Sequence, residues 1–143
     1  MIAAVDANVL ASAALQLIRG GPPAAIWFAA LQGLFALVVS QHVLTEVENT
    51  LRKPYFTARL SPAELASFLT RLSSRAAVTS ITARVVGIAT HPEDDLFLAT
   101  AVSANADYLV TGDLKLQALG TYQGVTIVSP RDFLDLLIDQ PPV

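Results

Sequence analysis

The 143-residue chain contains no cysteine, and charged residues are scarce. Without cysteine the chain can form no disulfide framework and no thiolate metal site, and it has no thiolate nucleophile. Charged residues make up 15% of the sequence and hydrophobic residues 53%, which is apolar for a soluble domain. The surplus of apolar side chains indicates a further buried surface, which we expect to be a homodimer contact or an interface with a partner protein.

Long uninterrupted hydrophobic segments are also missing. The most apolar stretch, residues 22–39, has Gln32 as its one strongly polar residue and approaches the shortest length that can span a bilayer. A proline pair begins this stretch and Gly33 divides it, which favours a buried helix followed by a strand. Asp6 interrupts the apolar N-terminus, and no basic segment precedes it, so no signal peptide is expected. We therefore expect a cytoplasmic protein without a membrane span.

Short β-favouring segments alternate with helical ones along the chain, whose length fits a single domain. Strands are expected at residues 2–5, 34–39, 77–81, 108–111 and 125–128. Helices are expected at residues 8–17, 24–31, 41–53, 82–89, 92–106, 114–119 and 130–138, with a further one behind the capping box Ser61–Glu64. This alternation predicts an α/β sandwich with a mostly parallel sheet.

Four carboxylates lie where such a fold would bring them together. Asp6 ends the first strand, Asp113 follows a later one, Asp95 begins a helix, and Glu46 lies on the helix after the second strand, off its apolar stripe. The carboxyl ends of parallel strands meet at one edge of the sheet, so these acids can converge there. Carboxylates this close together repel one another unless a cation neutralises them. With no cysteine and no suitably placed histidine, the expected cation is Mg²⁺ or Mn²⁺.

Two of these acids, Asp95 and Asp113, also have a purely structural interpretation. Asp95 stands in the first turn of its helix, where an acid interacts favourably with the helix dipole. Asp113 precedes a short helical segment and would serve as its N-cap. The sequence around either acid does not decide between the two roles.

Basic residues are concentrated in one part of the chain. Residues 49–92 carry six arginines and lysines against one glutamate, and both flanking parts are acidic. This distribution is compatible with a phosphate-contacting flank beside an acidic pocket, with Arg52 and Lys53 as the candidate RNA-binding residues. A set of solvated helix faces is the alternative interpretation.

Four sequence segments, taken in order, resemble one known family. They are Val5–Leu10, Ser40 with Leu44–Val47, Pro92–Ala101 and Ala106–Asp113. The chain resembles the PIN-domain ribonucleases, particularly the VapC-like toxins of bacterial toxin–antitoxin systems. The resemblance implies a three-layer α/β/α sandwich, with one PIN-like nuclease domain over residues 1–139 and a short tail at 140–143.

The resemblance also implies an activity and a set of site residues. Asp6, Glu46, Asp95 and Asp113 match the family's acidic quartet, and Asn8 and Thr111 match its supporting polar positions. The quartet would hold one or two Mg²⁺ or Mn²⁺ ions and activate water to cleave an RNA phosphodiester. A small antitoxin would be the cognate partner, covering apolar surface and blocking the site.

One of the four assignments has a close competitor. Asp94 is adjacent to Asp95, and Asp95 is preferred because its spacing to Leu98 and Ala99 fits the family pattern better. His91 departs from the pattern, since many relatives have an acid at this position.

Three other functions are weighed against the nuclease. A phosphoacceptor receiver domain would have an acidic pair after the first strand, where this chain has Asp6-Ala7-Asn8, and a lysine after the last strand. A haloacid-dehalogenase-type phosphatase would have Asp-x-Asp, and Asn8 breaks that motif. The main alternative is a PIN-like module with weak or no catalysis that acts by binding protein or RNA.

Overall fold

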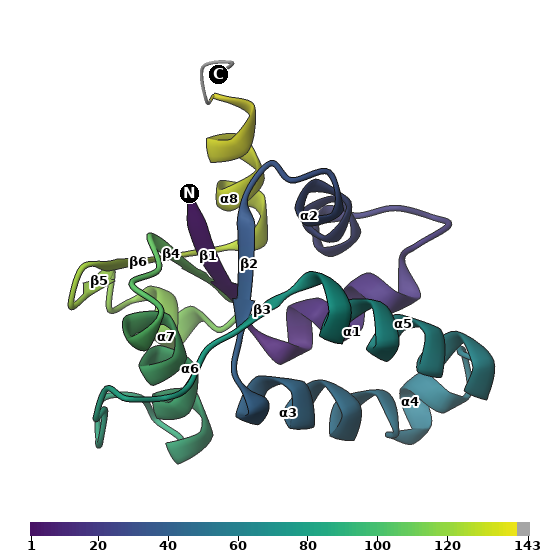
Figure 1. The fold of residues 1–143 in the computed structure, drawn as a ribbon, viewed down its shortest axis with the longest axis horizontal. Helices are drawn as coiled ribbons and strands as arrows, with labels where there is room; N and C mark the ends of the chain where they lie inside the picture. The colour runs from purple at the N-terminus through teal and green to yellow at the C-terminus, as the bar shows by residue number, and fades with distance from the viewer. Residues whose placement is uncertain (140–143) are drawn as a thin grey trace.

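The structure, a computed structural model, describes residues 1–139 and is built around a six-stranded sheet (Figure 1). Its strands are β1 (Ile2–Val5), β2 (Ala36–Val39), β3 (Ala77–Val78), β4 (Tyr108–Val110), β5 (Thr121–Tyr122) and β6 (Val125–Val128). Their order across the sheet is β3-β2-β1-β4-β6-β5, and every pairing is parallel except that of β5 with β6. The predicted tail at 140–143 lies outside the described residues.

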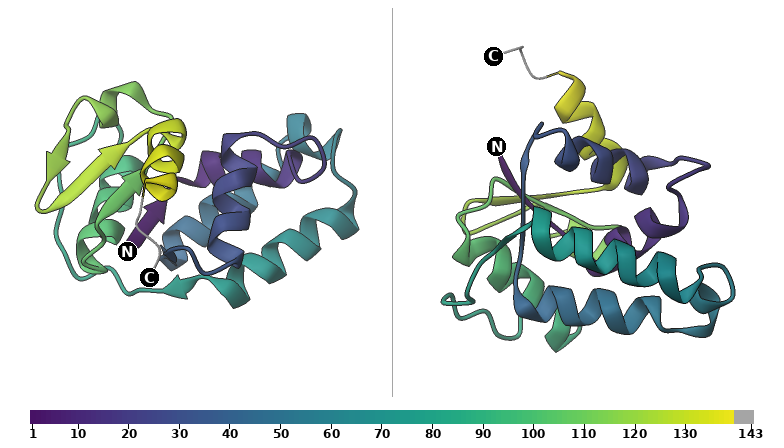
Figure 2. Two further views of the ribbon diagram at one scale, coloured as in Figure 1. Left: turned by 90° about the horizontal axis from the view of Figure 1, so that it is seen from above. Right: turned by 45° about the vertical axis from the view of Figure 1, so that its right-hand side comes forward.

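Helices cover both faces of this sheet. They are α1 (Ala7–Leu15), α2 (Pro22–Leu31), α3 (Gln41–Leu51), α4 (Pro54–Thr57), α5 (Pro62–Arg75), α6 (Pro92–Ser103), α7 (Leu114–Gln117) and α8 (Pro130–Ile138). Helices α1, α2, α3, α5 and α8 supply buried side chains to one hydrophobic core, while α6 and α7 supply most of the helical side chains of the other. In Figure 2 helices α1, α2, α3 and α5 lie to one side of the N-terminal strand, and α6 and α7 lie to the other. The predicted three-layer α/β/α sandwich is thereby confirmed.

Alternation along the central strands separates the two cores. In β1, Ala3 and Val5 belong to the larger core and Ala4 to the smaller one. In β4, Val110 faces the larger core and Leu109 the smaller. Successive side chains of a strand point to opposite faces, so a short strand buried on both sides has to be apolar throughout.

The helix starts follow the capping signals in the sequence. The Oγ of Ser40 accepts a hydrogen bond from the Val43 N–H and caps α3. Ser61 and Glu64 form the predicted capping box of α5. Ser40 has a second role, because its hydroxyl lies 2.8 Å from the Thr100 hydroxyl of α6. This buried contact ties α3 to α6 across the end of the sheet.

Residues 82–89 do not form the predicted helix. They belong to an irregular connection between β3 and α6. Gly87 has φ +73°, a left-handed backbone conformation that a continuing right-handed helix cannot contain. The backbone N–H groups of residues 87–89 instead donate to the Asp95 carboxylate. Strand β5 was also not predicted.

No helix within residues 1–139 combines the length and the apolar character needed to cross a bilayer. The apolar stretch at 22–39 contains α2 and β2, as its glycine and proline residues indicated.

Helix α8 provides a direct test of the larger core. Phe133 is fully buried, with its ring centroid 5.0 Å from that of Phe35 and 5.8 Å from that of Tyr108. Phe133→Ala should lower the free energy of unfolding by about 3–5 kcal/mol, because it removes buried area and leaves a cavity. Ile138 on the same helix is 78% exposed, so Ile138→Ala should change the free energy of unfolding by less than about 0.5 kcal/mol. Urea denaturation measures both, and equal effects would contradict this packing.

Candidate active site

The predicted acids gather where β1 and β4 end side by side. The two strands are parallel neighbours, with Val5 in register with Val110. Asp6 directly follows β1, Thr111 directly follows β4, and Asp113 comes two residues after Thr111. The chain leaves β1 toward α1 and β4 toward α7, on opposite faces of the sheet, which opens a crevice between the two strand ends.

Asp6 is only 6% exposed, and hydrogen bonds hold its carboxylate in a fixed orientation. Its Oδ1 accepts a hydrogen bond from the Asn8 N–H at 2.9 Å, and its Oδ2 accepts one from the Thr111 hydroxyl at 2.7 Å. The same Thr111 oxygen accepts the Asp113 N–H at 3.1 Å. One buried hydroxyl, that of Thr111, therefore connects the two acids at the strand ends.

Asp113 has the structural role that its sequence position allowed. Its Oδ1 accepts hydrogen bonds from the Lys115 and Leu116 N–H groups and so caps α7. Its Oδ2 takes no part in this cap. Asp113 also lines a cavity of about 410 Å³ together with Asp6 and Asp94. Capping and a place in the acidic site are thus compatible in this residue.

The structure separates the two neighbouring acids of α6. Asp94 lines the cavity with Asp6 and Asp113, as well as a second one that contains Glu46. Asp95 is buried elsewhere, and its two carboxylate oxygens accept three backbone hydrogen bonds from Gly87, Ile88 and Ala89. The geometry therefore brings Asp94 into the acidic group, in the place predicted for Asp95, and does not bring Asp95 there.

The charge of the site acts most visibly on Asp94. Partial burial raises the pKa of its carboxyl group above the ordinary value, and the negative charges of Asp113 and Asp6 raise it further. His91 works in the opposite direction, and Glu93 adds a small increase. Such a shift means that a negative charge on Asp94 is unfavourable in this cavity as long as nothing positive balances it.

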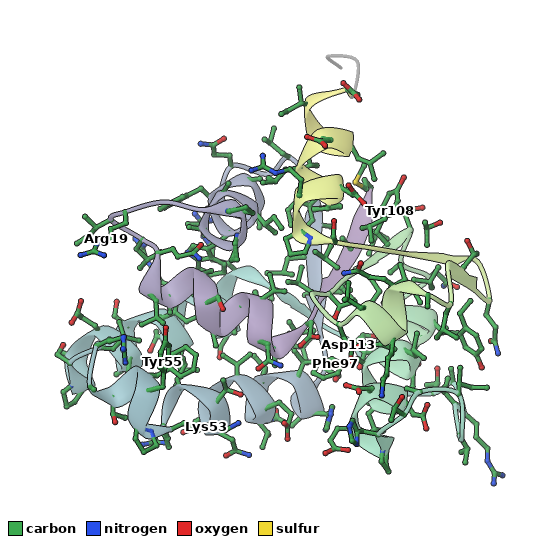
Figure 3. All side chains as sticks on the ribbon, turned by 180° about the vertical axis from the view of Figure 1, so that it is seen from behind. Arg19, Lys53, Tyr55, Phe97, Tyr108 and Asp113 are labelled. Carbon is green, nitrogen blue, oxygen red and sulfur yellow. The ribbon has the colours of Figure 1, made fainter. Side chains whose placement is uncertain are left out.

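Glu46 and Asn8 reach the site from the helices on the other side of the crevice. Both line a cavity of about 160 Å³ with Asp6, Asp94 and Lys53. Asn8 lines the larger cavity as well. Figure 3 labels Asp113, Phe97 and Lys53, which come from the start of α7, from α6 and from the junction of α3 with α4.

The two candidate RNA-binding residues differ in their surroundings. Lys53 lines the cavity that contains Glu46 and Asp94. The guanidinium Nη2 of Arg52 lies 2.9 Å from the Oε1 of Glu48, which is one helical turn earlier, and the two form an exposed ion pair. Of the two, only Lys53 borders the acids.

Sequence reasoning missed three residues that border the site. His91, Glu93 and Phe97 line the smaller cavity together with Glu46 and Asp94. Pro92 at the first position of α6 was the available signal for His91 and Glu93, which flank it at the helix start, whereas Phe97 lies in the second turn and had no such signal.

The family resemblance implies a metal ion, so the residues of the site must be able to ligate one. Within residues 1–139, no three carboxylate or imidazole groups are already grouped tightly enough to hold an ion. The donor chemistry does fit, because Asp6, Asp94 and Asp113 offer hard oxygen ligands to one cavity. The pKa of Asp94 is raised first by burial and then by the charges of Asp113 and Asp6, and a cation would oppose both effects. Asp6, Asp94 and Asp113 are therefore the candidate ligands, with Glu46 bordering the adjoining cavity.

Comparison with known proteins identifies the family. A sequence model of the PIN domain matches residues 3–115, which is well over half of the chain. The chain therefore belongs to the PIN-domain family, whose members are in general terms nucleases. No curated protein sequence matches it.

A solved structure has the same fold. The chain is similar to a chain in the crystal structure of VapBC2 from Rickettsia felis bound to a DNA fragment from their promoter. The TM-score is 0.62, and the similarity covers 90% of this chain and 98% of that chain, at 17% sequence identity. At this identity the comparison establishes the fold.

The raised pKa of Asp94 predicts how stability depends on pH. Because the folded protein holds this proton more tightly than the unfolded chain does, stability should fall as pH rises from the ordinary carboxyl pKa through the raised one. Asp94→Asn should therefore raise the melting temperature at neutral pH, and the gain should vanish in acid. Asp95→Asn is the matched comparison and should lower the melting temperature, because it disturbs three hydrogen bonds. Metal-free melting curves between about pH 3 and pH 8, which covers the range in which carboxyl groups titrate, measure the melting temperatures of both variants. A lower melting temperature of Asp94→Asn at neutral pH would contradict the assignment of Asp94 to the acidic group.

Proposed function

We propose that this protein is a metal-dependent endoribonuclease and the toxin of a toxin–antitoxin pair. The observation that carries the proposal is the group formed by Asp6, Asp94 and Asp113, which line one cavity at the carboxyl edge of a PIN-domain sheet. Asp94 takes the place in the acidic quartet that the sequence pattern gave to Asp95. Glu46 completes the set from α3.

The roles of the residues follow from their surroundings. Asp6 is the fixed member, since both of its oxygens are hydrogen-bonded in a buried position, and Thr111 holds it against Asp113. Asp94 and Glu46 approach from opposite sides of the crevice, on α6 and α3. One or two Mg²⁺ or Mn²⁺ ions would supply Lewis-acid binding of phosphate oxygens and a lowered pKa for an attacking water. Ligation by these four acids is part of the proposal.

The substrate is proposed to be RNA, held partly through its phosphates. Lys53 borders the smaller cavity with the acids, so its ammonium group can reach a phosphate next to the scissile bond. Arg52 is already paired with Glu48 and exposed, so we assign it no direct part in RNA binding.

A protein partner is supported by the apolar surface. A groove of about 510 Å³ runs between the end of α1 and helices α2 and α5, where the exposed Leu17 and Ile18 lie beside Arg19, Arg59 and Arg71. Ile18 is 96% exposed. A small antitoxin that covers such a surface would account for the high apolar content, and a second copy of this chain is the other candidate. We propose that the protein acts in the cytoplasm, where either partner would bind it.

The alternative is a PIN-like module that binds RNA or protein without cleaving it. It is favoured by one observation, namely that no three candidate ligands within residues 1–139 are closely grouped. The two functions differ in whether a divalent ion binds and whether RNA is cut.

The test is cleavage of cellular RNA with Mg²⁺ or Mn²⁺ by the wild type and by Asp6→Asn and Asp94→Asn. Each substitution should reduce the rate by at least about a hundredfold, because each removes charge placed to stabilise the reaction. EDTA should abolish cleavage by the wild type. Saturating Mn²⁺ should raise the free energy of unfolding of the wild type, by about 2.7 kcal/mol at a hundredfold excess over its dissociation constant.

Glu48→Gln is the matched control. Glu48 is on the same helix as Glu46 but is paired with Arg52 outside the acids' cavities, so this variant should cut like the wild type. Metal-induced stabilisation without cleavage of any RNA would favour the binding module. Cleavage that persists in both aspartate variants would refute the site.

A further inference from the structure

We propose that Asp95 is a positioning residue, which holds the segment before α6 and thereby fixes Asp94 opposite Asp6 and Asp113. The inference rests on the proposed function for its consequence in metal binding, and it gives Asp95 a role other than ligand. Asp95 is 7% exposed and lines neither of the two acid-containing cavities described above.

The Asp95 carboxylate is occupied by the backbone of residues 87–89. Its Oδ2 accepts the Gly87 N–H at 2.9 Å, and its Oδ1 accepts the N–H groups of Ile88 and Ala89 at 3.1 and 2.7 Å. Hydrogen bonds to an ionised acceptor are stronger than neutral ones. Three of them on one buried carboxylate leave little capacity for a metal ion and define the path of three consecutive residues.

Helix α6 holds this segment at both of its ends. Near its C-terminus, the Ser103 hydroxyl oxygen accepts the N–H groups of Thr82 and Ala83 at 2.9 and 3.0 Å. Near its N-terminus, Asp95 accepts those of residues 87–89. Between the two attachments, Val85 is buried in the smaller core. We call residues 82–89 the strap. Lacking regular secondary structure, it is held by side chains of α6.

The Asp95 end of the strap forms part of the site, and the Ser103 end does not. Ile88, Ala89 and Thr90 line a small cavity of about 30 Å³ together with Asp94 and Asp113. The chain then passes His91, whose carbonyl accepts the Asp94 N–H at 3.0 Å as α6 begins. Fixing residues 87–89 therefore fixes both the wall beside Asp94 and the first turn that carries it.

The experiment combines amide hydrogen exchange with Mn²⁺ binding in metal-titrated melting curves, for the wild type and three variants. Asp95→Asn should speed exchange at residues 87–89 and at the Asp94 and Asp95 amides by about tenfold or more, because one acceptor oxygen becomes a donor facing N–H groups. It should weaken Mn²⁺ binding by about 10- to 100-fold, as loss of a residue that orients ligands does. Asp94→Asn should abolish Mn²⁺ binding and leave exchange at 87–89 unchanged.

Ser103→Ala is the matched control. Ser103→Ala should speed amide exchange at residues 82 and 83. It should leave the Mn²⁺ affinity within about twofold of the wild-type value, because it acts at the end of the strap away from Asp94. If Asp95→Asn does not fold, Gly87→Ala replaces it. A Cβ at Gly87 meets open space, but φ +73° strains any other residue, so the strap is loosened from its own side with Asp95 intact.

Three outcomes would overturn the inference. Faster exchange at 87–89 with unchanged Mn²⁺ affinity would make the strap merely structural. Loss of Mn²⁺ binding with exchange at 87–89 intact would make Asp95 a ligand. Unchanged exchange at the Asp94 and Asp95 amides in Asp95→Asn would refute the positioning whether or not metal binds. A wild type that binds no Mn²⁺ while exchange behaves as expected would refute the metal-dependent function and leave Asp95 as the residue that orders the start of α6.

Discussion

Mutual repulsion among carboxylates is the constraint on which the rest of the site depends. Asp6, Asp94 and Asp113 share one cavity, and the pKa of Asp94 is raised by its burial there and, beyond that, by the charges of Asp113 and Asp6. The fold meets that cost with fixed hydrogen bonds. Thr111 links the acids at the two strand ends, and the Ser40–Thr100 contact ties the helices that carry Glu46 and Asp94. A cation would relieve the repulsion and leave the geometry in place.

The strand-end residues could be read from the sequence because a strand has a simple register. Asp6 directly follows one short apolar strand, and Asp113 follows another after Thr111 and Gly112. Parallel strands bring their carboxyl ends to one edge of the sheet whatever the details of packing. Glu46 could be placed because α3 has an apolar stripe that fixes which side faces the core. The fold class followed from the same alternation of strands and helices.

Helix α6 offered no such reference. Its residues 96–102 are apolar or small on all sides, so the sequence does not fix the rotation of the helix about its axis. Neighbouring residues on a helix point about 100° apart, and Asp94 and Asp95 therefore face different surroundings. Only the tertiary contact with residues 87–89 distinguishes them. The same contact explains why a helix was wrongly predicted for 82–89: its partner lies beyond any local pattern.

Between its two attachments the strap is held to the smaller core at Val85. Arg84 and Val86 are exposed there, on either side of the buried Val85. Surface connections of this kind tolerate changes of length and sequence far better than the elements they join. Residues could be inserted or exchanged between the Ser103 and Asp95 anchors without moving the acids, since each anchor is made by α6 itself. The border of the acidic crevice can thus diversify while the arrangement of the acids stays constant.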